Sequence, residues 1–270
     1  MENLTNETNK TKMKKTNTEN IENKDLLNEF MTSDYDAENY KLYVGDSNEI
    51  IDSFIEKGLK VNHIITDPPY SISKKNNFGT LKKPRRGINF GDWDKNFDLF
   101  TWIPKYEQIL DKNGSMIVFC SYRYISFIIK TMEECGLEVK DIIVWKKSNP
   151  MPRNIDRRYV QDMEFAIWAI KKGAKWTFNK LEGHKYMRSM YETSLVSGTE
   201  KTGHPTQKSL KLMKDLISVH TKENDLILDP FMGSGTTGLA ALLLKRKFIG
   251  LEISKEYLDL TVDRFKTFNY

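Results

Sequence analysis

The chain has 270 residues, of which 39% are hydrophobic and 29% are charged, a composition typical of a soluble globular protein. It has no apolar run of membrane-helix length, its N-terminus is polar, and its two cysteines, Cys120 and Cys135, stand in unrelated contexts. These features argue against a membrane protein, a disulfide framework and a cysteine-based metal site, and we expect a cytoplasmic protein without a metal.

The net charge of +5 is unevenly distributed along the chain. Residues 1–40 contain five Lys and nine Asp or Glu, a net charge of −4, so the remaining 230 residues carry +9. A basic body fits a polyanionic partner such as nucleic acid, although a lysine-rich surface alone gives the same value. Residues 1–38 hold few large apolar groups, which predicts a disordered polar arm with a short helix near 25–31, followed by one folded domain over 39–270.

Beyond this arm, strand-like and helix-like patterns alternate. Strands are predicted at 41–44, 61–67, 115–120, 138–147, 163–172, 225–231 and 247–253. Helices are predicted at 48–58, 98–111, 124–136, 206–221, 235–245 and 255–268. The alternation predicts an α/β fold, a mostly parallel seven-stranded sheet with helices on both faces.

The stretch LDPFMGSGTTGLAALL, residues 228–243, places a tight glycine loop between a strand and a helix. Gly233 and Gly235 allow the backbone to approach a ligand closely, and the N-terminus of the following helix favours an anionic group there. The next strand ends at Glu252, about 20 residues later, the spacing of a carboxylate that binds ribose hydroxyls. The loop lacks the lysine of a P-loop and the regular third glycine of a dinucleotide fingerprint. We predict a nucleotide-type cofactor site, the alternative being a plain strand-to-helix turn.

The stretch IITDPPY, residues 64–70, ends an apolar strand with an acid, two prolines and a tyrosine. Two prolines cannot continue a central strand, so the chain must leave the sheet after Asp67. Asp67 and the carbonyl of Pro68 can each accept a hydrogen bond from an exocyclic amine, and Tyr70 offers a ring for stacking. An enzyme that reads a flipped nucleotide needs these groups, although a stiff loop with a core tyrosine is the simpler alternative.

Together, DPPY and FMGSGTT resemble the amino-methyltransferases that use S-adenosylmethionine. Here DPPY precedes the glycine loop, and HPTQKSL, residues 204–210, directly precedes the strand that carries this loop. This order resembles the β-class, circularly permuted DNA amino-methyltransferases of restriction–modification systems, over about residues 40–265. The resemblance implies a Rossmann-like methyltransferase fold, a catalytic domain over 39–270 and S-adenosylmethionine as the cofactor.

The resemblance also assigns roles to matching positions. The methionine part of the cofactor would lie against Asp229, Phe231, Gly233, Gly235, Thr236 and Thr237. Glu252 would hold the ribose hydroxyls, Asp46 would lie near the adenine of the cofactor, and Asp67 would border the cofactor as well. The cofactor carboxylate would meet Thr206, Gln207 and Lys208. The target base would meet Asp67, Pro68, Pro69 and Tyr70.

These assignments imply direct transfer of a methyl group to an amine nitrogen, with most of the acceleration coming from positioning and electrostatics. Acceptors at Asp67 and Pro68 would leave more electron density on the nitrogen. Ring-carbon methylation needs a cysteine nucleophile, and we interpret Cys120 and Cys135 as structural residues. In the family, Asp before the diproline usually accompanies N6-adenine and Ser usually accompanies N4-cytosine, so Asp67 favours adenine.

Three segments are candidates for DNA contact, each with an ordinary solvated surface as the alternative. The candidate residues in the loop 71–95 are Lys74, Lys75, Lys82, Lys83, Arg85 and Arg86. The candidate residues in the stretch 145–160 are Lys146, Lys147, Arg153, Arg157 and Arg158. The candidate residues in the target-recognition insertion expected at 176–203 are His184, Lys185, Arg188 and Tyr191. This insertion is short, which implies a short site, help from the 71–95 loop, or a homodimer.

The leading hypothesis is a site-specific N6-adenine DNA methyltransferase that protects host DNA from a cognate restriction endonuclease acting on the same site. The alternatives left open are an N4-cytosine enzyme, an enzyme acting on amines of RNA or of protein glutamine, and a non-catalytic DNA-binding subunit. The motif order and HPTQK argue against the RNA or protein substrate, and the intact DPPY and glycine loop argue against the non-catalytic subunit.

Overall fold

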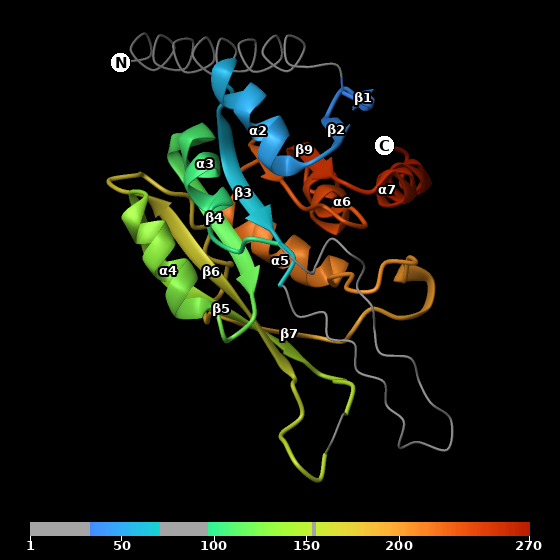
Figure 1. Ribbon diagram of the computed structural model, residues 1–270. Helices are drawn as coiled ribbons and strands as arrows, with labels where there is room; N and C mark the ends of the chain where they lie inside the picture. Colours follow the sequence, from blue (N-terminus) through green and yellow to red (C-terminus); the bar gives the residue numbers. More distant parts are fainter. Residues whose placement is uncertain (1–32, 71–96, 153–154) are drawn as a thin grey trace, which may run out of the picture.

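The computed structural model describes residues 33–70, 97–152 and 155–270, and within them the strands form one nine-stranded sheet (Figure 1). The strands are β1 (Tyr35–Ala37), β2 (Tyr40–Val44), β3 (Val61–Thr66), β4 (Leu110–Cys120), β5 (Leu137–Lys147), β6 (Met163–Lys171), β7 (Met190–Thr193), β8 (Leu226–Asp229) and β9 (Lys247–Glu252). Their order across the sheet is β1-β2-β9-β8-β3-β4-β6-β5-β7.

Helices cover both faces of this sheet (Figure 1). They are α2 (Ser47–Glu56), α3 (Trp102–Ile109), α4 (Ile125–Glu134), α5 (Leu210–His220), α6 (Thr236–Leu243) and α7 (Lys255–Thr267), with a 3-10 turn at Gly198–Glu200. One core cluster joins α2, α3 and α4 to the sheet through residues such as Phe54, Trp102 and Met132. The other joins α5, α6 and α7 to the opposite face through Leu216, Leu239 and Phe265. Every helix except α6 therefore buries one apolar stripe, as expected from its periodicity, whereas α6 is buried on nearly all sides over residues 236–242.

The sheet brings the candidate motifs together at one edge. Neighbouring strands β2, β9, β8, β3 and β4 all pair in parallel, so their carboxyl ends lie on the same side. Asp229 and Glu252 end β8 and β9, while Asp67 follows β3 and Asp46 follows β2. Among the described strands, only β1 with β2 and β6 with its two neighbours pair antiparallel. Ligand sites of open α/β sheets lie at this carboxyl edge.

The seven predicted strands are the seven inner strands of the observed sheet, and both additional strands are edge strands. β1 pairs antiparallel with β2, so the predicted disordered arm over 1–38 is wrong for its last residues. β7 pairs with β5 and lies inside the insertion expected at 176–203. Each is only three or four residues long, too short for an alternation pattern to identify. The helix expected near 25–31 lies outside the described residues.

Two predicted helices begin four residues later than expected. α3 begins at Trp102 rather than 98, because the side chain of Asp98 accepts hydrogen bonds from the backbone of Phe100 (2.9 Å) and Thr101 (3.1 Å) and forms a turn. α5 begins at Leu210 rather than 206, after Ser209, whose hydroxyl accepts from the backbone of Leu212. No helix in the described part of the chain is long and apolar enough to cross a membrane.

Candidate active site

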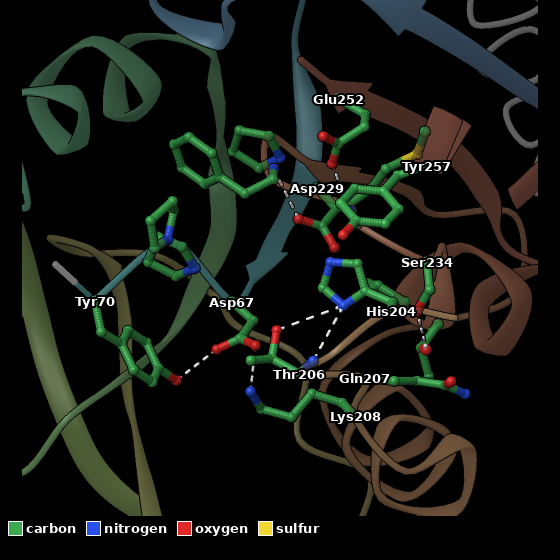
Figure 2. A pocket seen from close by; sticks show the side chains of 18 of the residues that line it. Asp67, Tyr70, His204, Thr206, Gln207, Lys208, Asp229, Ser234, Glu252 and Tyr257 are labelled. Carbon is green, nitrogen blue, oxygen red and sulfur yellow. Dashed lines mark hydrogen bonds and ion pairs between the residues drawn. The ribbon is translucent and has the colours of Figure 1, made fainter. Parts of the chain in front are cut away.

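A cavity of about 750 Å³ opens at the carboxyl edge of the sheet. Its walls come from the turns after β2, β3, β8 and β9, from the segment before α5 and from the adjoining ends of β5 and β6. Figure 2 shows Asp67, His204, Asp229 and Glu252 around this space. Ligand pockets for drug-sized molecules occupy roughly 300–1,000 Å³, so the cavity has room for a nucleotide-sized ligand. The DPPY motif, the glycine loop and HPTQK all contribute to this single cavity.

The glycine loop between β8 and α6 is held in place from two sides. Toward the cavity, the backbone N–H of Gly233 donates to Oε2 of Glu252 at 2.9 Å. From behind, a guanidinium nitrogen of Arg264 donates to the carbonyl of Ser234 at 3.0 Å. Gly235 has a φ of +69°, and a Cβ there would lie 2.3 Å from Cγ2 of Thr261. Only glycine fits this turn, which explains the motif that the sequence carries.

Two buried carboxylates flank the loop. Asp229 accepts from the hydroxyl of Thr66 at 2.6 Å and from the backbone of Phe231 at 3.1 Å, and burial raises its pKa to about 6. Glu252 also accepts from the backbone of Ser254 at 2.9 Å, and burial raises its pKa as well. Both acids are thus oriented acceptors beside the glycine backbone, suited to hydroxyl or ammonium donors of a ligand.

The remaining predicted cofactor residues lie around the same space. Asp46 caps α2 by accepting from the backbone of Asn48 at 2.8 Å, and the ring of Phe231 packs edge-on against Trp102 at 5.3 Å. Of all twelve predicted cofactor residues, Gly235 is the one that shapes the loop from within rather than lining the cavity. The lining residues are Asp46, Asp67, Thr206, Gln207, Lys208, Asp229, Phe231, Gly233, Thr236, Thr237 and Glu252.

The DPPY motif forms the opposite wall of the cavity. The hydroxyl of Tyr70 donates to Oδ1 of Asp67, and the ammonium of Lys208 forms an ion pair with Oδ2 (Figure 2). Burial raises the pKa of Asp67, and the positive charge of Lys208 acts in the opposite direction. Pro68 and Pro69 also line the cavity. The acid, the diproline and the ring therefore face one space, as the motif predicts.

A second acid, Glu164, faces Asp67 across Lys208. The ammonium of Lys208 lies 3.2 Å from Oε2 of Glu164, and the ammonium of Lys147 lies 2.5 Å from Oε1. The order of charges is therefore Asp67, Lys208, Glu164, Lys147, alternating in sign. Sequence reasoning missed Glu164 because its partners belong to other elements. The available signal was an acid at the start of an otherwise apolar strand.

HPTQK has a partly structural role. The ring of His204 packs edge-on against Tyr257 at 4.5 Å and closes over the glycine loop, where a Cβ on Gly233 would lie 3.0 Å from its Nε2. Burial, reinforced by Lys208, lowers the pKa of His204 to about 4, so the ring is neutral at neutral pH. The amide of Gln207 accepts from the backbone of Thr202 and donates to the carbonyl of Glu200, both at 2.8 Å. Gln207 thus fixes the preceding turn.

The predicted DNA contacts divide into three groups. The charged residues of 71–95 and Arg153 lie outside the described residues. Arg157, Arg158, His184, Lys185 and Arg188 are exposed, and Tyr191 is half-buried. Lys146 pairs with Glu192 at 3.2 Å at the surface. Lys147 lines the cavity and pairs with Glu164, because its position at the end of β5 directs it inward, and its contact with DNA stays a prediction.

The fold and the cavity define an α/β methyltransferase whose glycine loop and DPPY wall share one pocket. Residues 61–263 match the DNA methylase family of N6 and N4 amino-methyltransferases, and the chain belongs to this family. It is a DNA methyltransferase that uses S-adenosylmethionine, as the resemblance implies, and the predicted Rossmann-like fold is confirmed.

Among curated proteins, the chain is 34% identical to the Type II methyltransferase M2.MboI of Moraxella bovis, over 85% of this chain and 89% of that protein. It is also 34% identical to M2.DpnII of Streptococcus pneumoniae, over 76% and 82% of the two chains. Among solved structures, the M1.HpyAVI–SAM complex is 51% identical with a TM-score of 0.71, covering 84% of this chain and 98% of that one. These similarities confirm the prediction of a restriction–modification methyltransferase.

Proposed function

We propose that this protein transfers a methyl group from S-adenosylmethionine to the exocyclic N6 of an adenine flipped out of DNA at a specific site. The observation that carries this assignment is that β3 delivers Asp67, with Tyr70 beside it, into the same cavity as the glycine loop. An amine donor held at Asp67 is thereby placed next to the cofactor site.

The residues present fit the cofactor. The cavity volume, the two oriented carboxylates Asp229 and Glu252, and a glycine backbone closed by His204 match a ligand with hydroxyl and amine donors. Glu252 would hold the ribose hydroxyls, Asp46 would border the adenine, and Asp229 with the loop backbone would hold the methionine part. Thr206 lies at the mouth, where its hydroxyl can reach the carboxylate. When bound, S-adenosylmethionine supplies an electrophilic methyl group.

The base side of the cavity orients the amine. Asp67 and the carbonyl of Pro68 would accept its two hydrogens, which leaves more electron density on the nitrogen, and Tyr70 would stack on the base. Asp before the diproline favours adenine over cytosine by analogy with the family. Burial and the charge of Asp67 raise the pKa of Cys120 to about 12, so this neighbouring thiol is a poor nucleophile, which supports amine over ring-carbon methylation.

DNA approaches the open mouth of the cavity. The exposed Arg157 and Arg158 lie on the loop between β5 and β6, whose Met151 lines the cavity, and their charges suit phosphate contacts. The protein would act in the cytoplasm. There it would methylate the site that a cognate restriction endonuclease cuts and so protect host DNA, as a monomer or as a homodimer.

Substituting Asp67→Ala tests this function. We expect the variant to bind S-adenosylmethionine and to melt close to the wild type, while transfer of labelled methyl to unmethylated genomic DNA falls by about 10³-fold or more. Glu138→Gln, which removes an exposed partner of Lys140, is the control and should leave transfer within about twofold. Normal transfer by the Asp67 variant would contradict the assignment.

A further inference from the structure

Both carboxylate oxygens of Asp67 already have donors from the protein. Tyr70 donates to Oδ1 and Lys208 pairs with Oδ2. The proposed function requires Asp67 to accept from the amine of the target base. A carboxylate that carries an ammonium is a weaker acceptor, and the positive charge of that ammonium disfavours the positive charge that develops on the attacking nitrogen. Methyl transfer should therefore be faster when Lys208 has moved off Asp67.

Glu164 is the only described acid beside Lys208 that can receive this charge. The ammonium of Lys208 lies 3.2 Å from the buried Oε2 of Glu164, an ion-pair distance, and no other donor reaches this oxygen among the described residues. Lys208 is thus shared between the two acids and lies closer to Asp67 than to Glu164. A small rotation of Lys208 would shorten its contact with Oε2 of Glu164 and strengthen the charge-assisted bond there.

The two acids differ in how firmly they are held. Glu164 is at the start of β6, paired with Trp145 of β5, and its Oε1 is fixed by Lys147 at 2.5 Å. Asp67 follows the last residue of β3, where the diproline ends the strand. The fixed acid is therefore the one that can keep Lys208, while the acid at the strand end receives the base.

We propose that Glu164 is a positioning residue that draws Lys208 away from Asp67 when the target amine binds. Lys208 is buried, with 7% of its surface exposed, so it needs a carboxylate partner in both positions. Without Glu164 the ammonium stays on Asp67, competes with the amine and opposes the charge that develops on its nitrogen. This inference rests on the proposed function, because it concerns the same acid and the same amine.

The test is a double-mutant cycle with Glu164→Gln, Lys208→Met and the double variant. For each protein we would measure single-turnover methyl transfer to DNA, the Kd for S-adenosylmethionine by calorimetry, and the melting temperature. We expect Glu164→Gln alone to slow transfer by about tenfold to 100-fold with cofactor affinity within about twofold, because the amine and not the cofactor competes with Lys208. In the Lys208→Met background, the same change should cost less than about threefold.

A merely structural Glu164 would give a different result. If Glu164 only stabilises the packing of β6, Glu164→Gln should slow methyl transfer equally with Lys208 present or absent, or should lower the affinity for S-adenosylmethionine in parallel. Either result overturns the inference. If Glu164→Gln fails to fold, the comparison of Lys208→Met with the double variant decides alone: equal rates support the inference, and a tenfold loss overturns it.

Glu138→Gln is the matched control, since it removes an acid from the other end of β5 and should leave every quantity unchanged. A wild-type protein that transfers nothing to adenine would instead contradict the proposed function, which keeps the two failures distinct.

Discussion

The two halves of the cavity are built in different ways. The cofactor half consists of the glycine loop 229–237 and Glu252, and its geometry is set by backbone hydrogen bonds and by glycine conformation. The base half consists of Asp67, Tyr70, Lys208, Glu164 and Lys147, and its geometry is set by alternating side-chain charges from separate elements. The first half is preformed, whereas the second must exchange partners when a base enters.

This difference determines how each half should respond to substitution. A change in the cofactor half should alter cofactor affinity and stability together, because backbone is displaced. A change in the base half should alter transfer to DNA and its pH dependence, while cofactor affinity is kept. The following substitutions test that separation.

Gly235→Ala should have the largest effect of the four. The added Cβ would lie 2.3 Å from Cγ2 of Thr261, in a residue with a φ of +69°. We expect a loss of roughly 2–4 kcal/mol in unfolding free energy, and at least a tenfold weaker Kd for S-adenosylmethionine by calorimetry. Gly173→Ala is the control, because Gly173 has a φ of +79° with no atom within 4 Å of the added Cβ, so only the strain of about 1 kcal/mol remains. Equal effects of the two changes would contradict the close packing of the loop.

Two substitutions of Tyr70 distinguish the effect of ring stacking from the effect of hydrogen bonding in the base half. Tyr70→Ala removes the ring, and base–aromatic stacking is worth about 1–3 kcal/mol, so kcat/KM for DNA should fall about tenfold to 100-fold. Tyr70→Phe removes only the hydroxyl that donates to Asp67 and should stay within about threefold. Steady-state kinetics with varied DNA measures both, and equal losses would assign the effect to the hydroxyl instead.

Lys208→Met should shift the pH dependence of transfer. Burial raises the pKa of Asp67 and Lys208 lowers it, so removal of Lys208 raises that pKa further. Because the amine needs the ionised carboxylate, the acidic limb of the pH–rate profile should move to higher pH, with the largest deficit at low pH. Lys140→Met, at an exposed pair, should not move it. An unmoved limb in Lys208→Met would show that Asp67 does not titrate in the rate profile.

Asp229→Asn should raise stability at neutral pH. The folded pKa of about 6 lies above the unfolded value, so the stability contributed by protonated Asp229 is complete below about pH 4 and is lost as pH rises through about 6. Asn keeps the Oδ1 acceptor for Thr66 without the buried charge. Thermal melts should show roughly 1–3 kcal/mol of stabilisation at pH 8 and none at pH 4. A melting temperature lowered at pH 8 would contradict the unfavourable burial of this charge.

The sequence predicted the cofactor half well because its information is local. Gly233 and Gly235 are needed for a turn that lies within a single motif, and Glu252 follows at a fixed spacing. The inner seven strands were predictable for the same reason, since each carries its own apolar run. Edge strands β1 and β7 were missed because their short pairing depends on a neighbour.

The base half was predictable only in part. DPPY is a local motif and identified Asp67 and Tyr70. The contact between Glu164 and Lys147 depends on the antiparallel pairing of β5 with β6. This pairing brings the end of β5, with Lys147, next to the start of β6, with Glu164. No local spacing encodes this contact, so Lys147 could not be distinguished from the surface cations Lys146 and Arg157 by sequence.

The central claim is that this cavity methylates the N6 of adenine. The most direct measurement is to incubate the purified protein with labelled S-adenosylmethionine and unmethylated genomic DNA, digest the DNA to nucleosides, and identify the labelled nucleoside by mass spectrometry. The account predicts label in N6-methyladenine alone. Label in N4-methylcytosine would contradict the assignment of the base, and DNA without label would contradict the assignment of the reaction.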